Sequence, residues 1–201
     1  MPGAKRADDA QIISRGDAAY PNRLSDRLGT DTPLFITVVG SAVPLSGQLT
    51  AFLCSKEAPG ATILKAFDQA AAWREAGRCV ISGFHSPLEQ QCLEILLRGK
   101  QSVVIVLARR LGKLRLPAGQ RKALTDGRLT IVSPFLATEK RATAELARQR
   151  NRFVAALADE VIFAFVSQGG SLSRLAKEVA TWGMESRHLH REANRKDPAS
   201  S

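Results

Sequence analysis

The sequence predicts an α/β fold: a Rossmann-like, mainly parallel sheet with helices on both faces. Segments of strand length, rich in branched and aromatic residues, alternate with segments of helical periodicity along most of the chain. Several strand segments are apolar throughout, as in SVVIVLA at 102–108, which is typical of a parallel strand covered on both faces. A chain of 201 residues is also long enough to bury a substantial core as one domain.

Two strands are expected first, at 34–39 and 49–54, because turn signals bound each apolar run. An apolar stripe at helical spacing then predicts a helix over 61–77, in which Gly77 is a suitable C-terminal residue. The next segment, RCVIS at 78–82, has the composition of a short buried strand.

The helix expected at 86–99 has the clearest boundaries in the chain. Ser86 is a suitable N-cap, and Pro87 fits the first helical position. Glu89 stands three residues after Ser86 and completes a capping box, while Gly99 ends the helix.

The alternation continues to the end of the predicted domain. Further strands are expected at 102–108, 129–133 and 160–166, and further helices at 117–126, 138–157 and 170–183. We therefore expect a mobile leader over 1–17, a Rossmann-like domain over 18–187 and a basic disordered tail over 188–201.

The charge balance indicates an anionic partner. Lysine and arginine total 29 against 19 acidic residues, which gives a net charge of +10 and a pI near 10.2. Such a balance favours nucleic acid, nucleotides or anionic surfaces as partners. The run from Arg98 to Arg128 holds nine basic residues and a single acidic one, Asp126; a solvated face would explain this run equally well.

Other features of the sequence exclude several classes of protein. No apolar segment approaches the roughly 18 residues of a membrane span, and the N-terminus lacks the apolar core of a secretory signal. The three cysteines lie in apolar surroundings without metal-ligand spacing, so we expect reduced, buried thiols in a cytoplasmic protein. We expect no metal and no cofactor.

Candidate ligand-binding residues follow the strands. In open parallel sheets, ligands bind beyond the carboxyl ends of the strands. The loop SQGGS at 167–171 follows a strand and opens a helix, so its backbone N–H groups would favour a phosphate. Ser82 and Gly83 occupy the equivalent place after another strand, and Lys56 follows the strand at 49–54.

Two further groups of residues allow more than one interpretation. Arg150, Asn151 and Arg152 lie in the middle of a helix, and at 100° per residue they cannot all face one way. One or two of them could point towards the crevice at the end of the sheet. Glu89 could act as a general base at a nucleotide sugar, although the capping box with Ser86 explains it fully.

The order of the motifs resembles the Rossmann-like domain of the DprA/Smf family, DNA-processing proteins that protect incoming single-stranded DNA and load the RecA recombinase. The matching segments are YPNRL (20–24), PLFITVVGSAVPL (33–45), LTAFLCSK (49–56), VISGFHSPLEQQCL (80–93), RNR (150–152) and QGGSL (168–172). The resemblance runs from about residue 18 to 187. The RNR segment followed by a Gly-Ser loop is its most specific part.

The resemblance implies a basic pocket at the carboxyl end of the sheet that binds single-stranded DNA through its phosphates, with no catalytic residue. Carried over position by position, the pocket comprises Ser55, Lys56, Ser82, Gly83, Arg150, Asn151, Arg152, Gly169, Gly170 and Ser171. It also implies a role in DNA uptake and recombination. A RecA contact and a homodimer are further expectations.

The sequence departs from the family pattern at the strand ends. Cys54 stands where the family has a glycine, which we expect to push a phosphate outward. Ser86 and Pro87 replace an Arg-Gly pair, so one expected DNA-binding arginine is missing, and Glu89 replaces an aspartate.

Two other functions stay open at this stage. One is a nucleoside-monophosphate hydrolase of the related phosphoribohydrolase group, although the PGGxGTxxE signature of that group is not present in SQGGSLSRLAKE (167–178). The other is a nucleotide sensor or interaction scaffold that kept the fold and lost DNA binding.

Overall fold

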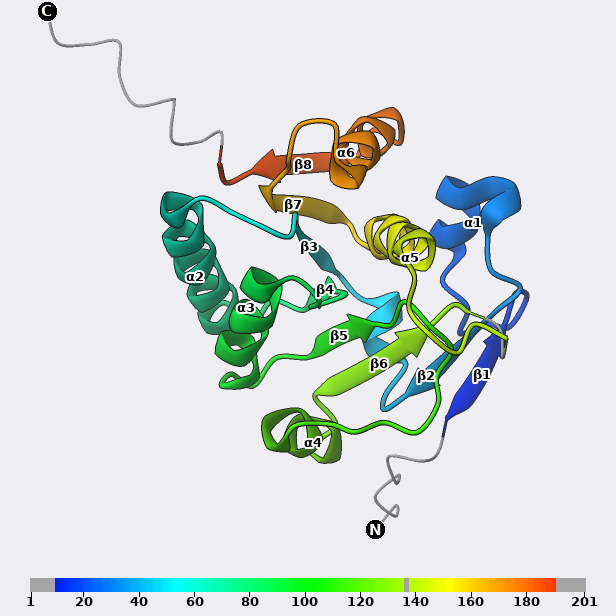
Figure 1. The fold of residues 1–201 in the computed structure, drawn as a ribbon. Helices are drawn as coiled ribbons and strands as arrows, with labels where there is room; N and C mark the ends of the chain where they lie inside the picture. The colour runs from blue at the N-terminus through cyan, green and yellow to red at the C-terminus, as the bar shows by residue number, and fades with distance from the viewer. Residues whose placement is uncertain (1–9, 136–137, 191–201) are drawn as a thin grey trace, which may run out of the picture.

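An eight-stranded sheet organises the chain in the computed structural model, which describes residues 10–135 and 138–190 (Figure 1). Its strands lie in the order β1-β2-β6-β5-β4-β3-β7-β8. They span β1 (Gln11–Ser14), β2 (Phe35–Val39), β3 (Thr50–Cys54), β4 (Val80–Ser82), β5 (Val103–Val106), β6 (Leu129–Ser133), β7 (Glu160–Phe165) and β8 (Glu185–His188). The six strands from β6 to β8 are parallel, whereas β1 and β2 run antiparallel to their neighbours.

Helices cover both faces of this sheet, so the predicted fold class is confirmed. On one face lie α2 (Gly60–Glu75), α3 (Pro87–Leu97) and α4 (Ala118–Thr125); on the other lie α1 (Asn22–Leu28), α5 (Ala144–Leu157) and α6 (Ser171–Thr181) (Figure 1). Two 3-10 turns, Gly29–Asp31 and Val43–Ser46, complete the described elements. Among the described residues, no helix combines the length and the apolar character that crossing a bilayer requires.

The core lies in two layers, one on each face of the sheet. Every residue of β3, β5 and β6 is buried, as the apolar sequences of these strands predict. Side chains alternate between the faces: Leu53 joins the layer under α1, α5 and α6, whereas Phe52 joins the layer under α2 and α3.

The ordered region is longer at both ends than the sequence predicts. Residues 11–14, placed in the expected leader, form the edge strand β1, which is held by the antiparallel ladder with β2 and by buried Ile13. The expected tail begins at 188, but β8 ends there and Leu189 is buried. Both strands have only four residues and little apolar alternation, so local patterns could not identify them. The rest of the predicted leader and tail lies outside the described residues.

Two other boundaries also differ. Helix α5 begins at Ala144 rather than at 138, because the Thr143 hydroxyl accepts a hydrogen bond from the Leu146 amide at 3.1 Å and caps the helix there. Helix α1 forms before the first element expected from the sequence, and it buries the side chains of Leu24 and Leu28.

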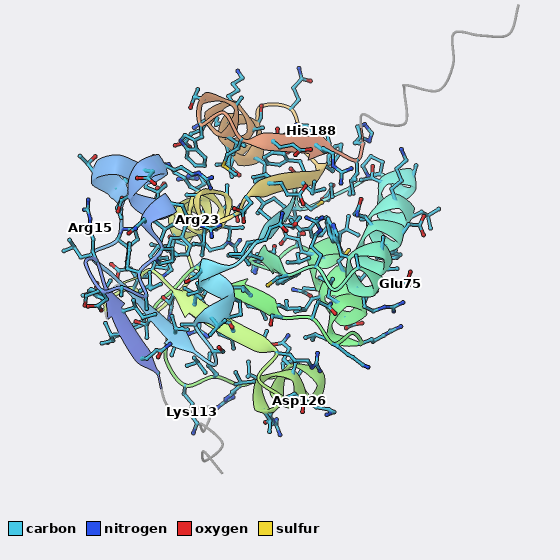
Figure 2. The ribbon with its side chains drawn as sticks, turned by 180° about the vertical axis from the view of Figure 1, so that it is seen from behind. Arg15, Arg23, Glu75, Lys113, Asp126 and His188 are labelled. Atoms are coloured by element: carbon cyan, nitrogen blue, oxygen red, sulfur yellow. The ribbon has the colours of Figure 1, made fainter. Side chains whose placement is uncertain are left out.

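Helix α1 fixes the position of α5. Arg23 lies beside α5 (Figure 2) and donates hydrogen bonds from Nη1 to the Leu157 carbonyl at 3.1 Å and to Asp159 at 2.9 Å. Arg27 donates to the Ala156 carbonyl at 2.9 Å. Carbonyls in the last turn of a helix have no partner within the helix, so these guanidinium groups satisfy them. The helix that carries residues 150–152 is therefore anchored at its C-terminal end.

Candidate nucleic-acid interface

The chain reverses direction across the sheet at β3 and β7. From β3 it proceeds outward through β4, β5 and β6, then crosses back to β7 on the other side of β3. Such a reversal opens a crevice at the carboxyl ends of the two adjacent strands, where open α/β sheets bind their ligands. We use the name crevice for the region beyond the ends of β3, β4 and β7, which are followed by the loops at 55–59, 83–86 and 166–170.

Hydrogen bonds join these two loops. The Ser55 hydroxyl accepts from the Ser167 amide at 3.0 Å and from the Ser167 hydroxyl at 3.2 Å. The Ser55 amide donates to the Phe165 carbonyl at 2.9 Å. Ser55 is therefore used to hold the loop that follows β7 in place.

The two glycines of this loop are required by its geometry. Gly169 has a φ of +70°, which side-chain-bearing residues rarely adopt. A Cβ built on Gly170 would lie 2.5 Å from the Ser167 Oγ. Gly170 is the N-cap of α6 and has no side chain that could accept a hydrogen bond from the first amides of the helix. The first residue of the helix, Ser171, is exposed.

The predicted capping box of α3 is present, and Glu89 does more than cap. Its carboxylate accepts from the amides of Ser86 at 3.1 Å and His85 at 2.8 Å, and across the crevice from the Cys54 amide at 2.9 Å. Glu89 is only 3% exposed. Both of its oxygens are therefore occupied in fastening the end of β3 to the loop between β4 and α3. The side chain of Cys54 itself is buried in the core layer.

Arg150 is the exceptional residue of the site. It is 5% exposed, and its guanidinium lies against Gly83, where a Cβ would stand 1.8 Å from Nη1. Burial lowers the pKa of Arg150 from its ordinary value, and the negative charge of Glu89 opposes this shift. Within the described part of the chain, Arg150 makes no ion pair, and its hydrogen bond is from Nε to Asn151 Oδ1 at 2.8 Å. Among the described residues, its outer nitrogens Nη1 and Nη2 have no hydrogen-bond partner in the protein.

Arg152 has different surroundings. Its Nε donates to Glu178 at 2.6 Å and its Nη1 to Asp31 at 2.7 Å. These two carboxylates compensate its charge, so Arg152 ties α5 to α6 and to the turn after α1.

A groove of about 610 Å³ lies between α5 and α6. Its apolar lining comes from Leu28, Pro33, Pro134, Phe135, Phe153, Leu172 and Leu175. Three residues predicted for the site, Asn151, Arg152 and Ser171, line this groove. Asn151 accepts from Arg150 and also lines the groove, so it lies between the crevice and the groove.

The remaining predicted residues divide by exposure. Lys56 is exposed at the rim of the crevice. Ser82 is fully buried, and its hydroxyl accepts from the Phe84 amide at 3.2 Å, which stabilises a turn in which Phe84 has a φ of 44°. Ser82 therefore shapes the loop, and Gly83 makes room for the Arg150 guanidinium.

Two of the three cysteines, Cys54 and Cys92, are buried as expected, whereas Cys79 is half-buried. Burial raises the pKa of Cys54, Cys79 and Cys92 to about 12 each, with Glu89 adding to the shift at Cys54 and Cys92. None of the three is in a disulfide. Across the described residues, no cluster of three or more histidine, cysteine or acidic side chains could hold a metal ion.

The fold defines a class: Rossmann-like α/β proteins, in which the order of the strands reverses between β3 and β7. Comparison with known families is more specific. The model of the family described as DNA recombination-mediator protein A matches residues 11–180. The chain belongs to this family, which confirms the resemblance seen in its motifs.

Solved structures agree with this assignment at the level of the fold. DNA processing protein A (DprA) from Streptococcus pneumoniae superimposes with a TM-score of 0.75 at 16% identity, covering 94% of this chain and 70% of that one. The Helicobacter pylori protein, solved for its single-stranded DNA binding mode, gives 0.72 at 15% identity and covers 96% and 90%. No curated protein matches the chain in sequence.

Proposed function

We propose that this protein binds single-stranded DNA by gripping its phosphates in the crevice between the ends of β3, β4 and β7, and that it acts in DNA uptake and recombination. Membership of the DNA recombination-mediator protein A family supports the process. The related Helicobacter pylori protein, by its title, binds single-stranded DNA. A RecA contact, a homodimer and a cytoplasmic location belong to the same proposal.

The observation that carries the proposal is the buried guanidinium of Arg150. Removing a cation from water has a cost of several kcal/mol, which is normally offset by an acidic partner. Arg150 has none within ion-pair distance among the described residues, and the carboxylate of Glu89 is occupied by backbone amides. A phosphate at Nη1 and Nη2 would complete the site with charge-assisted, bidentate hydrogen bonds.

Two other groups that follow neighbouring strand ends support the proposal. The loop after β7 presents the amides at the start of α6, where the helix dipole favours an anion. Lys56 stands exposed at the rim and adds a second positive charge. Recognition through phosphates predicts binding that depends little on sequence and weakens with salt.

Nucleotide binding is the alternative that a specific observation favours. The groove between α5 and α6 has a volume of about 610 Å³, in the range of small-molecule sites, and it adjoins the crevice through Asn151. Hydrolysis of a nucleoside monophosphate is less well supported, because both oxygens of Glu89 accept backbone hydrogen bonds. A general base needs a free lone pair directed at its substrate.

Fluorescence polarisation distinguishes these functions. Labelled single-stranded DNA, the matching duplex and AMP are titrated at two salt concentrations. The proposal expects the single strand to bind most tightly and to lose affinity as salt rises. Tight AMP binding without single-strand binding would favour the nucleotide sensor, and release of free adenine from AMP would show the hydrolase.

A further inference from the structure

The loop between β5 and α4 holds an uncompensated run of positive charge. We call residues 107–117, LARRLGKLRLP, the basic strap. From Leu107 to Thr125 the sequence contains six basic residues and no acidic residue. Eleven residues without helix or strand make a connection longer than the roughly 2–6 residues usual between a strand and a helix.

Leucines hold the strap against the protein. Leu111, Leu114 and Leu116 are half-buried and pack on the core layer under α2, α3 and α4. Lys113 and Arg115 alternate with them and are exposed. Each cation thus lies next to a leucine that anchors the strap, and such anchoring reduces the entropic cost of binding.

Hydrogen bonds fix the start of the strap to the carboxyl edge of the sheet. The Ser133 hydroxyl donates to the Arg109 carbonyl at 2.7 Å. The Arg110 amide donates to the Glu139 carbonyl at 2.8 Å. The Ser133 hydroxyl also accepts from the amide of Phe135, which lines the groove between α5 and α6. The start of the strap therefore lies next to one end of this groove.

The charges of the strap have no acidic ion-pair partner in the part of the chain that the structure describes. Within the described residues, no ion pair involves Arg110, Lys113 or Arg115. Nearby Asp126 is already engaged by Lys122 and Arg128, which belong to α4 and the turn after it. Figure 2 shows Lys113 at the lower edge of the molecule, on the same side as Asp126. The strap thus leads away from the crevice along one flank.

We infer that the basic strap is a second binding surface for the nucleic-acid backbone, which continues the path of a strand held in the crevice. This inference rests on the proposed function and extends it, because a strand bound to both the crevice and the strap occupies a longer site than the crevice alone. An anionic lipid surface and an acidic protein would also attract lysine and arginine. We favour a nucleic-acid strand because Ser133 bonds both Arg109, at the start of the strap, and Phe135, which lines the same groove as Asn151 beside Arg150.

The test compares oligothymidylates of two lengths, about 6 and about 40 nucleotides, which lie within and beyond the size of a single small site. The double variant Lys113→Ala, Arg115→Ala removes two exposed cations of the strap. Arg98→Ala, Lys100→Ala is the matched control, because these residues are equally exposed but lie before β5, at the opposite edge of the sheet. Polarisation is measured for each variant over a range of salt.

Counterion release gives the expected loss of affinity in the strap variant. Each lost phosphate contact reduces the slope of log K against log salt by about 0.7, so the strap variant should lose about 1.4 in slope and about 25-fold in affinity for the long strand at about 0.1 M salt. Affinity for the short strand should stay within about twofold, and the control should keep both affinities.

Each other result has a distinct meaning. Unchanged long-strand affinity in the strap variant overturns the inference and leaves the crevice intact. An equal loss of affinity in the control variant also overturns the inference, because the effect then comes from net charge. An equal loss of affinity for the short and the long strand overturns it too, because the effect then belongs to the crevice. Failure of the wild-type chain to bind either strand rejects the proposed function and the strap together. If only binding to anionic lipid vesicles falls in the strap variant, the partner is a membrane surface and the inference is wrong.

Discussion

A buried arginine can stabilise the fold or bind a ligand, and replacing Arg150 with methionine separates these two roles. Methionine has a similar length and no charge, so it fills the space beside Gly83 without the guanidinium. If Arg150 is kept for a ligand, the substitution should remove binding and leave the fold intact.

The effect on stability can be worked out from the contacts of Arg150. The variant loses one hydrogen bond, to Asn151, worth about 1 kcal/mol, and the attraction of Glu89. It also avoids burying a cation without an ion pair, which has a cost of several kcal/mol. These terms nearly cancel, so the free energy of unfolding should change by less than about 1.5 kcal/mol, or roughly 3–6 °C in Tm for a domain of this size.

The effect on binding should be much larger. Two charge-assisted hydrogen bonds to a phosphate contribute about 2–3 kcal/mol, so affinity for single-stranded DNA should fall about 30- to 150-fold. Arg152→Met is the control: it breaks the ion pairs with Asp31 and Glu178, so it should reduce stability by about 1 kcal/mol and affinity only slightly. Thermal unfolding and polarisation measure the two quantities. An Arg150→Met protein that unfolds many degrees lower and binds DNA normally would refute the reasoning.

Other substitutions test the supporting structure. Gly83→Ala places a methyl group where the Arg150 guanidinium lies; because this guanidinium is the end of a flexible side chain, stability should fall by only about 1 kcal/mol, while DNA affinity falls at least about tenfold. Normal affinity in this variant would show that the position of the guanidinium does not matter. Arg23→Ala with Arg27→Ala leaves carbonyls at the end of α5 without partners, so chemical denaturation should show a loss of about 2–4 kcal/mol; a loss below about 0.5 kcal/mol would mean that water satisfies them. With the pKa of each raised to about 12, the buried thiols of Cys54 and Cys92 should resist iodoacetamide at about pH 8 until the protein unfolds, and fast labelling of these two in the native protein would contradict their burial.

Most of the fold could be predicted because its central elements carry local signals. The strands around β5 are short apolar runs between turn residues, and the start of α3 is marked by Ser86, Pro87 and Glu89. The edge strands carry no such signal. Strand β8 reads ESRH, and its place depends on the ladder with β7 and on the burial of Leu189, which are long-range interactions.

The sequence could predict which residues belong to the site but not which contacts each of them makes. Sequence reasoning grouped Arg150 and Arg152 together, yet one is buried beside Gly83 and the other is paired with two acids on another face of α5. Helical geometry predicts that the two differ in direction, but the acids come from distant segments, so the sequence could not show which arginine keeps a free charge. The link from Glu89 to the Cys54 amide is likewise a tertiary contact without a local motif.

A structure of the protein with a short oligothymidylate tests the central claim most directly. The account predicts a phosphate whose oxygens lie about 2.7–2.9 Å from the outer nitrogens of Arg150, with the amide of Ser171 close to the same phosphate. A strand bound at the opposite edge of the sheet, or one in the crevice with its phosphates directed away from Arg150, would contradict it.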